Sequence, residues 1–172
     1  MGVHEHKTAA PQVVRCAVVT VSDTRTEADD KSGAEIKRLL NSAGHTLDRC
    51  QIIPDESEHI TSVVRTLTAD PDLDAVVLTG GTGVAPRDCT YEAVAGLLTK
   101  QLDGFGELFR MISYEEIGSA AMLSRAVGGV VGNTAVFALP GSTGACRTAM
   151  EKLILPELAH LVSLANPKRS GA

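Results

Sequence analysis

Three apolar runs constrain the fold of this chain, because each is followed by a polar loop and then by a stretch with helical spacing. The runs read RCAVVTVSD (15–23), TLDRCQIIPD (46–55) and AVVLT (75–79). Neighbouring parallel strands need a crossover of a dozen or more residues, which a helix usually supplies. The alternation therefore predicts a three-layer, doubly wound α/β fold, with a mostly parallel sheet and helices on both faces.

The later part of the chain has a different pattern. In RAVGGVVGNTAVFALPG, two apolar segments flank Gly132 and Asn133, which predicts a short antiparallel hairpin. Residues 102–124 are predicted to be mostly helical, and a final helix begins near Ser142. Among the earlier helices, Ser32 and Glu35 have the spacing of a capping box.

Composition limits the class of protein. The chain has 172 residues, of which 44% are hydrophobic and 3% aromatic, so one domain with a core of Val, Leu, Ile and Ala is expected. We expect a flexible arm over 1–13, the domain over 14–166 and a flexible tail over 167–172. The net charge of −5 offers no general attraction to nucleic acid or an anionic membrane.

The same residues give an expectation about location. No run reaches 18 apolar residues, and the first residues lack the apolar core of a signal peptide. The four cysteines are far apart, without disulfide or zinc-ligand spacing. We therefore expect a cytoplasmic protein with reduced thiols.

Polar loops follow the three predicted parallel strands and the last strand of the predicted hairpin. They read SDTR, PDES, TGGTGVAPRDCT and LPGSTG. In open parallel α/β sheets, ligands bind beyond the carboxyl ends of the strands. We expect these loops to meet at one edge of the sheet and to form a binding site there.

The third loop has the composition of an anion site. Gly80, Gly81, Thr82 and Gly83 let the backbone approach an oxyanion closely, and a helix is predicted to begin near Thr90. Arg87 could contact a phosphate or brace the loop. The alternative is a tight turn from strand to helix, with Asp88 or Thr90 as an ordinary helix cap. The loop contains no lysine, which argues against a P-loop nucleotidase.

Two carboxylates stand beside this loop. Asp55 and Asp88 at one sheet edge, next to a phosphate cradle, suit Mg²⁺ bridged to substrate phosphates. Both could instead cap helices, Asp55 near a predicted N-cap at Ser57. Asp23, after Ser22, could simply form a turn.

The fourth loop and one cysteine leave further alternatives. Pro140, Gly141 and Ser142 could close around an anion, or Ser142 or Thr143 could cap the final helix. Cys89 adjoins Asp88 at a helix start, where a thiolate is favoured, although packing is the simpler interpretation.

Several segments together resemble one known family. LTGGTGVAPRDCTYEAV, VVTVSDTR, IIPDES, GFGELFRMISYEEIGSAAMLSRAVGG and FALPGSTGACRTAMEKLILPEL occur in the order found in molybdenum cofactor biosynthesis proteins of the MoaB/Mog type, which also form the G domain of gephyrin. The resemblance covers about 15–162, and two of these segments look closer to MoaB than to Mog.

This resemblance implies an activity and its residues. It implies adenylyl transfer from ATP to the terminal phosphate of molybdopterin, with Mg²⁺, in a homotrimer or a hexamer of identical chains. Asp55 and Asp88 match the catalytic, metal-handling aspartates. Binding positions are matched by the Gly80–Gly83 loop, by Ser22 with Asp23, and by Pro140, Gly141 and Ser142.

Two other classes of protein are alternatives to this enzyme. A binding module of the same family would hold molybdopterin without turnover. Release of pyrophosphate from ATP only when molybdopterin is added would distinguish the enzyme from the module. A nicotinamide dehydrogenase is disfavoured, because SDTRTEADD, not a glycine fingerprint, follows the first strand.

Overall fold

The computed structural model describes residues 11–169. These residues form a six-stranded sheet in the order β2-β1-β3-β6-β5-β4. The strands are β1 (Arg15–Val21), β2 (Thr46–Ile53), β3 (Ala75–Thr79), β4 (Lys100–Gln101), β5 (Val127–Val131) and β6 (Thr134–Leu139). β2, β1, β3 and β6 run parallel, whereas β5 is antiparallel to β6 and to β4. The predicted parallel sheet and late hairpin are both confirmed.

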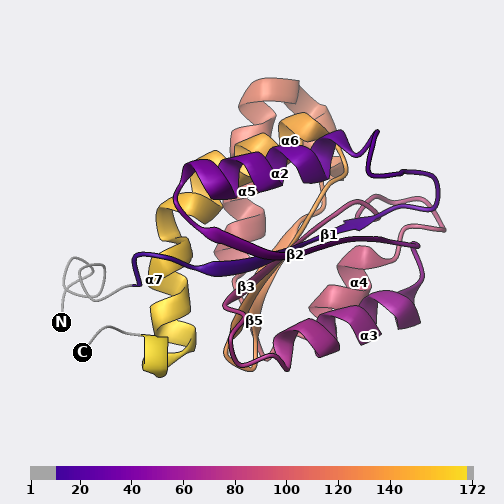
Figure 1. The fold of residues 1–172 in the computed structure, drawn as a ribbon. Helices are drawn as coiled ribbons and strands as arrows, with labels where there is room; N and C mark the ends of the chain where they lie inside the picture. The colour runs from indigo at the N-terminus through magenta and orange to yellow at the C-terminus, as the bar shows by residue number, and fades with distance from the viewer. Residues whose placement is uncertain (1–10, 170–172) are drawn as a thin grey trace.

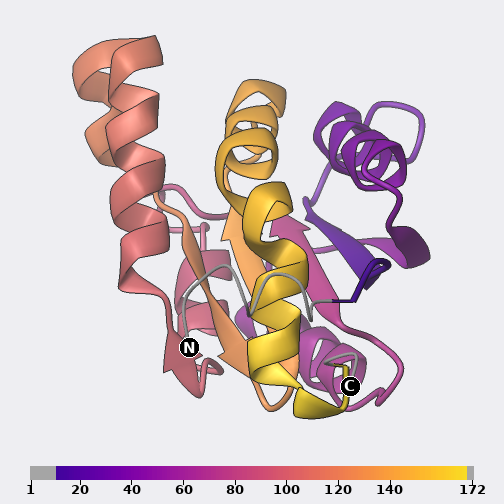
Figure 2. The same cartoon turned by 90° about the vertical axis from the view of Figure 1, so that its left-hand side faces the viewer.

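Helices cover both faces of this sheet (Figure 1). They are α2 (Lys31–Ser42), α3 (Ser57–Thr68), α4 (Thr90–Ala95), α5 (Asp103–Ile117), α6 (Thr143–Ala149) and α7 (Leu155–Ala165). One face carries α2, α5, α6 and α7, and the other carries α3 and α4. A 3-10 segment (Gly118–Leu123) follows α5, and a π-helical turn (Met150–Ile154) joins α6 to α7 in one nearly continuous rod (Figure 2).

Two apolar cores result, one on each face of the sheet. Successive side chains of a strand point to opposite faces, so β1 supplies Cys16 and Val18 to the first core and Ala17 and Val19 to the second. Aliphatic residues dominate both cores, as the composition predicts. All three phenylalanines pack together in the first core. Phe105 lies edge-on to Phe137 with ring centroids 5.1 Å apart, and stacks on Phe109 at 6.4 Å.

The predicted helix caps were only partly right. The capping box at Ser32 is wrong, because Asp30 is the N-cap of α2 and accepts from the Gly33 N–H at 2.9 Å. Ser57 is the first residue of α3, and Glu56 before it makes no capping bond. Ser142 is confirmed as the N-cap of α6, where its Oγ accepts from the Ala145 N–H at 3.2 Å.

The predicted terminal segments differ in how far the structure describes them. Most of the predicted arm, residues 1–10, lies outside the described residues, as do residues 170–172. Pro167–Arg169 form a 3-10 turn, although a flexible tail was expected from 167. Arg169 pairs with Asp74 at 2.8 Å and fixes this turn. No helix between residues 11 and 169 has the length and apolar character needed to cross a membrane.

Candidate functional site

Four strand-end loops meet at the carboxyl edge of the parallel strands. Between β1 and β3 the strand order reverses, which is the point where open α/β sheets bind ligands. Hydrogen bonds join the loops: Asp55 N–H donates to Asp23 Oδ1 at 3.1 Å, and Gly80 N–H donates to Leu139 O at 3.0 Å. The predicted convergence of these loops is therefore confirmed. An open hollow of about 600 Å³ beside them is lined in part by Ser22, Asp23 and Arg25.

Gly80 and Gly81 form the turn that leaves β3. Their φ angles are +100° and +65°, in the left-handed region that favours glycine. A Cβ on Gly80 would collide with the backbone oxygen of Val21. A Cβ on Gly81 would collide with Asp55 Oδ2 and Thr90 Oγ1. The turn thus brings bare backbone against two polar side chains of the site.

Asp55 is a buried carboxylate with one oxygen unused. Its side chain follows β2, the residue is 8% exposed, and Oδ1 accepts from the Cys89 N–H at 3.3 Å and Sγ at 3.0 Å. Within the described part of the chain, no donor reaches Oδ2, which lies against Gly81. This oxygen is available to a ligand.

Thr90 adds a second unused polar atom at the same place. It is fully buried, and its Oγ1 has no hydrogen-bond partner among residues 11–169. The predicted cap at Thr90 or Asp88 is wrong, because Cys89 is the N-cap of α4 and Thr90 is the first helical residue. A buried hydroxyl without a partner costs free energy, so a ligand that bonds it would relieve that cost.

The side chain of Asp88 packs against Gly83 of the same loop. Its Oδ2 accepts from the Ala85 N–H at 3.0 Å, and a Cβ on Gly83 would come within 2.5 Å of that oxygen. Within residues 11–169 no cluster of three or more His, Cys, Asp or Glu side chains could hold a metal. Asp55 and Asp88 fit Mg²⁺ only in the mode in which one or two carboxylates share the ion with substrate phosphates.

The Cys89 thiol donates a hydrogen bond to Asp55. Burial, together with its hydrogen bond to Asp55, raises the pKa of the Cys89 thiol to about 12. The thiol is therefore protonated near neutral pH, in contrast to the thiolate that a helix start would favour.

Arg87 braces the site in this structure. Its Nε donates to Asp23 Oδ2 at 2.8 Å, and this ion pair joins the loops after β3 and β1. The guanidinium, with the Asp55 N–H, lowers the pKa of the Asp23 carboxyl. Of the two roles left open by the sequence, bracing is the one that the contacts support.

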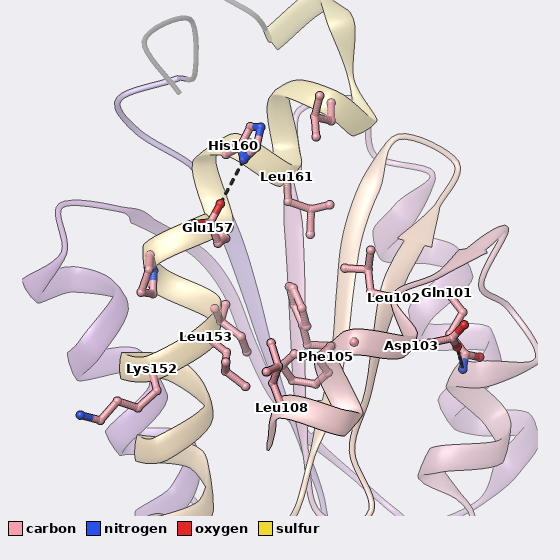
Figure 3. Close-up of a pocket in the computed structure, with 15 residues that line it drawn as sticks. Gln101, Leu102, Asp103, Phe105, Leu108, Lys152, Leu153, Glu157, His160 and Leu161 are labelled. Carbon is pink, nitrogen blue, oxygen red and sulfur yellow. Dashed lines mark hydrogen bonds and ion pairs between the residues drawn. The ribbon is translucent and has the colours of Figure 1, made fainter. Parts of the chain in front are cut away.

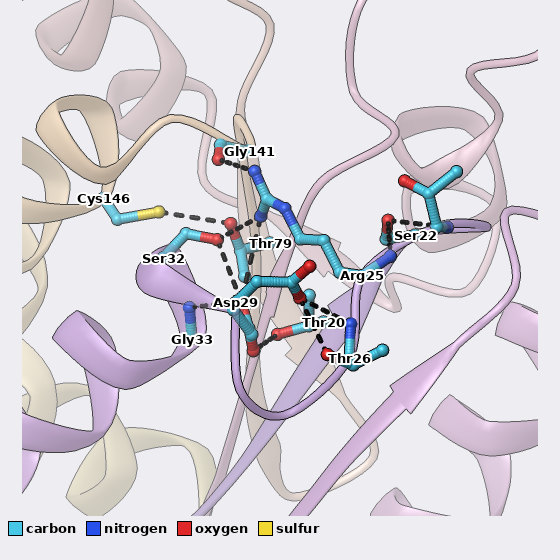
Figure 4. Close-up of polar contacts among 12 residues, drawn as sticks. Thr20, Ser22, Arg25, Thr26, Asp29, Ser32, Gly33, Thr79, Gly141 and Cys146 are labelled. Carbon is cyan, nitrogen blue, oxygen red and sulfur yellow. Dashed lines mark hydrogen bonds and ion pairs between the residues drawn. The ribbon is translucent and has the colours of Figure 1, made fainter.

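Two arginines of the site were missed by sequence reasoning. Arg25 reaches Gly141 O at 3.0 Å and Ser32 Oγ at 2.6 Å (Figure 4). Arg125 donates to Gly83 O at 3.4 Å, pairs with Glu92, and lies 4.3 Å from the ring centroid of Tyr91. Gly141 lies 116 residues from Arg25 and Gly83 lies 42 residues from Arg125, so no local pattern signals these two contacts.

A separate cavity of about 680 Å³ lies between α5 and α7 (Figure 3). Its lining is mainly apolar and includes Phe105, Leu108 and Leu161. The polar residues in its lining include two pairs that bond each other, Gln101 with Asp103 and His160 with Glu157. It shares no lining residue with the four loops and has no convergent catalytic groups.

Comparison with known proteins connects the site to a family. Residues 17–160, which contain all four loops, match the family described as a probable molybdopterin binding domain. Molybdenum cofactor biosynthesis protein B of Bacillus anthracis is 56% identical over 162 residues, covering 94% of this chain and 96% of that protein.

Solved structures agree with this match. A crystal structure of a molybdenum cofactor biosynthesis protein B shares 54% identity with a TM-score of 0.88, over 91% of this chain and 98% of that one. The tungsten cofactor synthesizing protein MoaB from Pyrococcus furiosus shares 37% identity with a TM-score of 0.83, over 91% and 99% of the chains. This chain therefore belongs to the molybdopterin-binding domain family of molybdenum cofactor biosynthesis proteins of the MoaB/Mog type.

Proposed function

We propose that this protein binds molybdopterin and transfers AMP to it from ATP. In this reaction an oxygen of the molybdopterin phosphate attacks the α-phosphorus of ATP. A new P–O bond forms as the bond between the α-phosphorus and its bridging oxygen breaks, and pyrophosphate leaves. Nucleotidyl transfer needs positioning and charge neutralisation more than a protein nucleophile. A site made of glycines, hydroxyls and aspartates, with a protonated cysteine, suits that requirement.

Different loops of the site would bind the phosphates, the metal ion and molybdopterin. The Gly80–Gly83 backbone approaches the phosphates, with Thr90 Oγ1 as a further hydrogen-bonding group. Asp55 and Asp88 would hold Mg²⁺, which when bound offsets the charge that develops on the phosphate oxygens. We assign the Ser22–Asp23 turn and the Pro140–Ser142 loop to the binding of molybdopterin.

One observation carries the proposal. Within residues 11–169, Asp55 Oδ2 accepts no hydrogen bond and the buried Thr90 Oγ1 has no partner, and both atoms lie against the left-handed Gly81. Packing alone would normally pair the buried hydroxyl of these two atoms. Their place beside a glycine turn is what a phosphate and metal site requires.

The test is pyrophosphate release from ATP on addition of molybdopterin. Asp55→Asn and Asp88→Asn should each slow release about 100-fold or more, since loss of metal-borne charge stabilisation costs several kcal/mol. Asp72→Asn, an exposed carboxylate away from the four loops, is the matched control and should keep full activity. Full activity of either site variant would refute the assignment.

A binding module without turnover is the second candidate. It is favoured by the fact that both aspartates already accept backbone N–H groups, Asp55 from Cys89 and Asp88 from Ala85. Tight molybdopterin binding by the wild-type protein, with no pyrophosphate release, would select this function. The trimer or hexamer stays a prediction, which light scattering of the purified protein would measure.

A further inference from the structure

Arg25 links two loops of the site that are far apart in the sequence. It follows β1, and its Nη2 donates to the carbonyl of Gly141, 116 residues later, at 3.0 Å. Nη1 donates to the buried Ser32 Oγ at 2.6 Å (Figure 4). It also lies 3.8 Å from Asp30 Oδ1. Asp30 is 5% exposed and balances the charge. The guanidinium is thus fixed from α2 and in turn fixes the loop after β6.

The neighbouring carbonyl in that loop is held as well. Pro140 O accepts from Thr79 Oγ1 at 2.9 Å and from Cys146 Sγ at 3.2 Å. Two successive carbonyls, of Pro140 and Gly141, therefore face protein donors. No side chain inside the loop makes these bonds.

Because trans peptides are planar, fixing these two carbonyls also fixes the direction of the N–H groups of Gly141 and Ser142. In such a peptide the N–H points away from the preceding carbonyl oxygen, and residues 11–169 contain no cis bond. The N–H groups of Gly141 and Ser142 therefore point away from Thr79, Cys146 and Arg25. Within the described chain neither N–H makes a hydrogen bond. Gly141 also lies beside the glycine turn, because a Cβ on it would be 3.3 Å from Gly80 Cα.

We infer that Arg25 is a positioning residue for molybdopterin. It holds the Gly141–Ser142 peptide and so orients the Ser142 N–H, while Thr79 and Cys146 hold the Pro140–Gly141 peptide and its Gly141 N–H. The two free N–H groups are then presented together to an acceptor oxygen of the ligand, beside the Gly80–Gly83 cradle. Arg25 itself does not need to touch the ligand. This inference rests on the proposed function only for the identity of the ligand, and not on turnover.

The chemistry of arginine suits this role. A planar guanidinium donates to two acceptors on different elements at once, whereas an ammonium is a compact point charge. Lysine at position 25 could keep the charge beside Asp30, but it could not hold Ser32 and Gly141 in the same geometry. A purely electrostatic role would be rescued by lysine, and a positioning role would not.

The primary experiment measures molybdopterin affinity, ATP affinity and thermal unfolding of Arg25→Met and Arg25→Lys. Loss of a charge-assisted hydrogen bond should weaken molybdopterin binding about 10-fold in Arg25→Met. Arg25→Lys should recover little of that affinity, and ATP affinity should be unchanged in both. Arg49→Met removes the same charge from an exposed pair with Asp70 and should bind normally. Unchanged molybdopterin affinity in folded Arg25→Met, or full rescue by lysine, overturns the inference.

A double-mutant cycle with Ser32 separates positioning from general destabilisation. Ser32→Ala removes an anchor of the guanidinium and should weaken molybdopterin binding by itself. In the Arg25→Met background the same change should add no further loss, because Ser32 acts through Arg25. Fully additive losses would overturn the inference.

The experiments distinguish a failure of the proposed adenylyl transfer from a failure of the positioning role of Arg25. A wild-type protein that binds molybdopterin but releases no pyrophosphate refutes adenylyl transfer, while weaker binding by Arg25→Met still supports the positioning role. A wild-type protein that does not bind molybdopterin refutes both.

Discussion

The two glycine-containing loops of the site obtain their shapes in opposite ways. The loop at Gly80–Gly83 is shaped from within, because two successive residues have positive φ and no side chain would fit at either. The loop at Pro140–Ser142 has no positive φ, and its carbonyls are held by Thr79, Cys146 and Arg25 from other elements. The first loop therefore depends on its own residues, and the second on its neighbours.

The largest effect is expected inside the first loop. Gly81→Ala would force a Cβ against Asp55 and Thr90 in a left-handed conformation. Displacement of reacting groups by about 1 Å can cost about 100-fold in rate, so pyrophosphate release should fall by at least that factor. Gly132→Ala is the control, because its φ is +60° but nothing lies within 4 Å of the added Cβ.

Gly132→Ala separates the cost of left-handed backbone strain from the cost of a steric collision with site residues. Left-handed strain alone costs about 1–2 kcal/mol of unfolding free energy, measurable by urea denaturation, and Gly132→Ala should show that cost with full activity. Equal activity of the two variants would mean that the Gly81 turn does not shape the site.

A smaller effect is expected from a neighbour of the second loop. Thr79→Val removes the hydroxyl that holds Pro140 O, and should lower stability by about 1 kcal/mol and molybdopterin affinity about fivefold. Thr134→Val removes another buried hydroxyl of the sheet, bonded to Leu73 O, and should leave molybdopterin affinity unchanged. If both variants bind normally, the loop is not held from outside.

Substitution inside the second loop should matter less than in the first. Gly141→Ala brings a Cβ to 3.3 Å from Gly80 Cα, which a shift of a few tenths of an ångström would relieve. We expect a loss of less than about 1 kcal/mol in urea denaturation and an activity well above that of Gly81→Ala. If Gly141→Ala loses as much activity as Gly81→Ala, the two loops do not differ in how their shapes are determined.

The smallest effect concerns the helix that follows the second loop. Glu35 on α2 bonds Arg38 and Arg147 of α6, and these lower its pKa from 4.5 to about 2. A depressed folded-state pKa stabilises the protein above about pH 4.5, and this stabilisation is lost as the pH falls toward 2. Glu35→Gln should therefore cost about 0.5 kcal/mol at pH 7, because both arginines are exposed. Thermal unfolding should show the difference vanish near pH 2, and a constant difference across that range would contradict it.

Local patterns predicted the fold well because its elements are local. β-branched runs, the Gly132–Asn133 turn and the Ser142 cap each depend on a few adjacent residues, and all three occur in the structure. Sheet edges follow from strand direction, so the meeting of the loops was also predictable. Three of the helix caps could not be predicted, because several polar residues compete near each helix start. Asp30, for example, caps α2 in place of Ser32.

The supporting contacts of the site could not be predicted from local patterns. Arg25 stands in a polar stretch that has the composition of an exposed loop, and its partner Gly141 is distant in sequence. The role of Arg125 likewise becomes visible only in the folded chain, where it contacts Gly83 and Tyr91. Glu35 was assigned to a capping box, whereas it bonds the nearby Arg38 and also Arg147, which lies 112 residues later. Such pairs depend on tertiary packing, which sequence spacing does not encode.

The strand order has a consequence for how the protein folds. β3 is hydrogen-bonded to β6, so Ala75 pairs with Ala135, and the chain between them must first be brought together. Pairing across long separations slows folding, because the entropy of closing the loop is lost before the contacts form. The loops after β1, β3 and β6 acquire their positions only after that step. A ligand that needs all of them binds only the assembled chain, and should raise the melting temperature by an amount that grows with the logarithm of its concentration above its Kd.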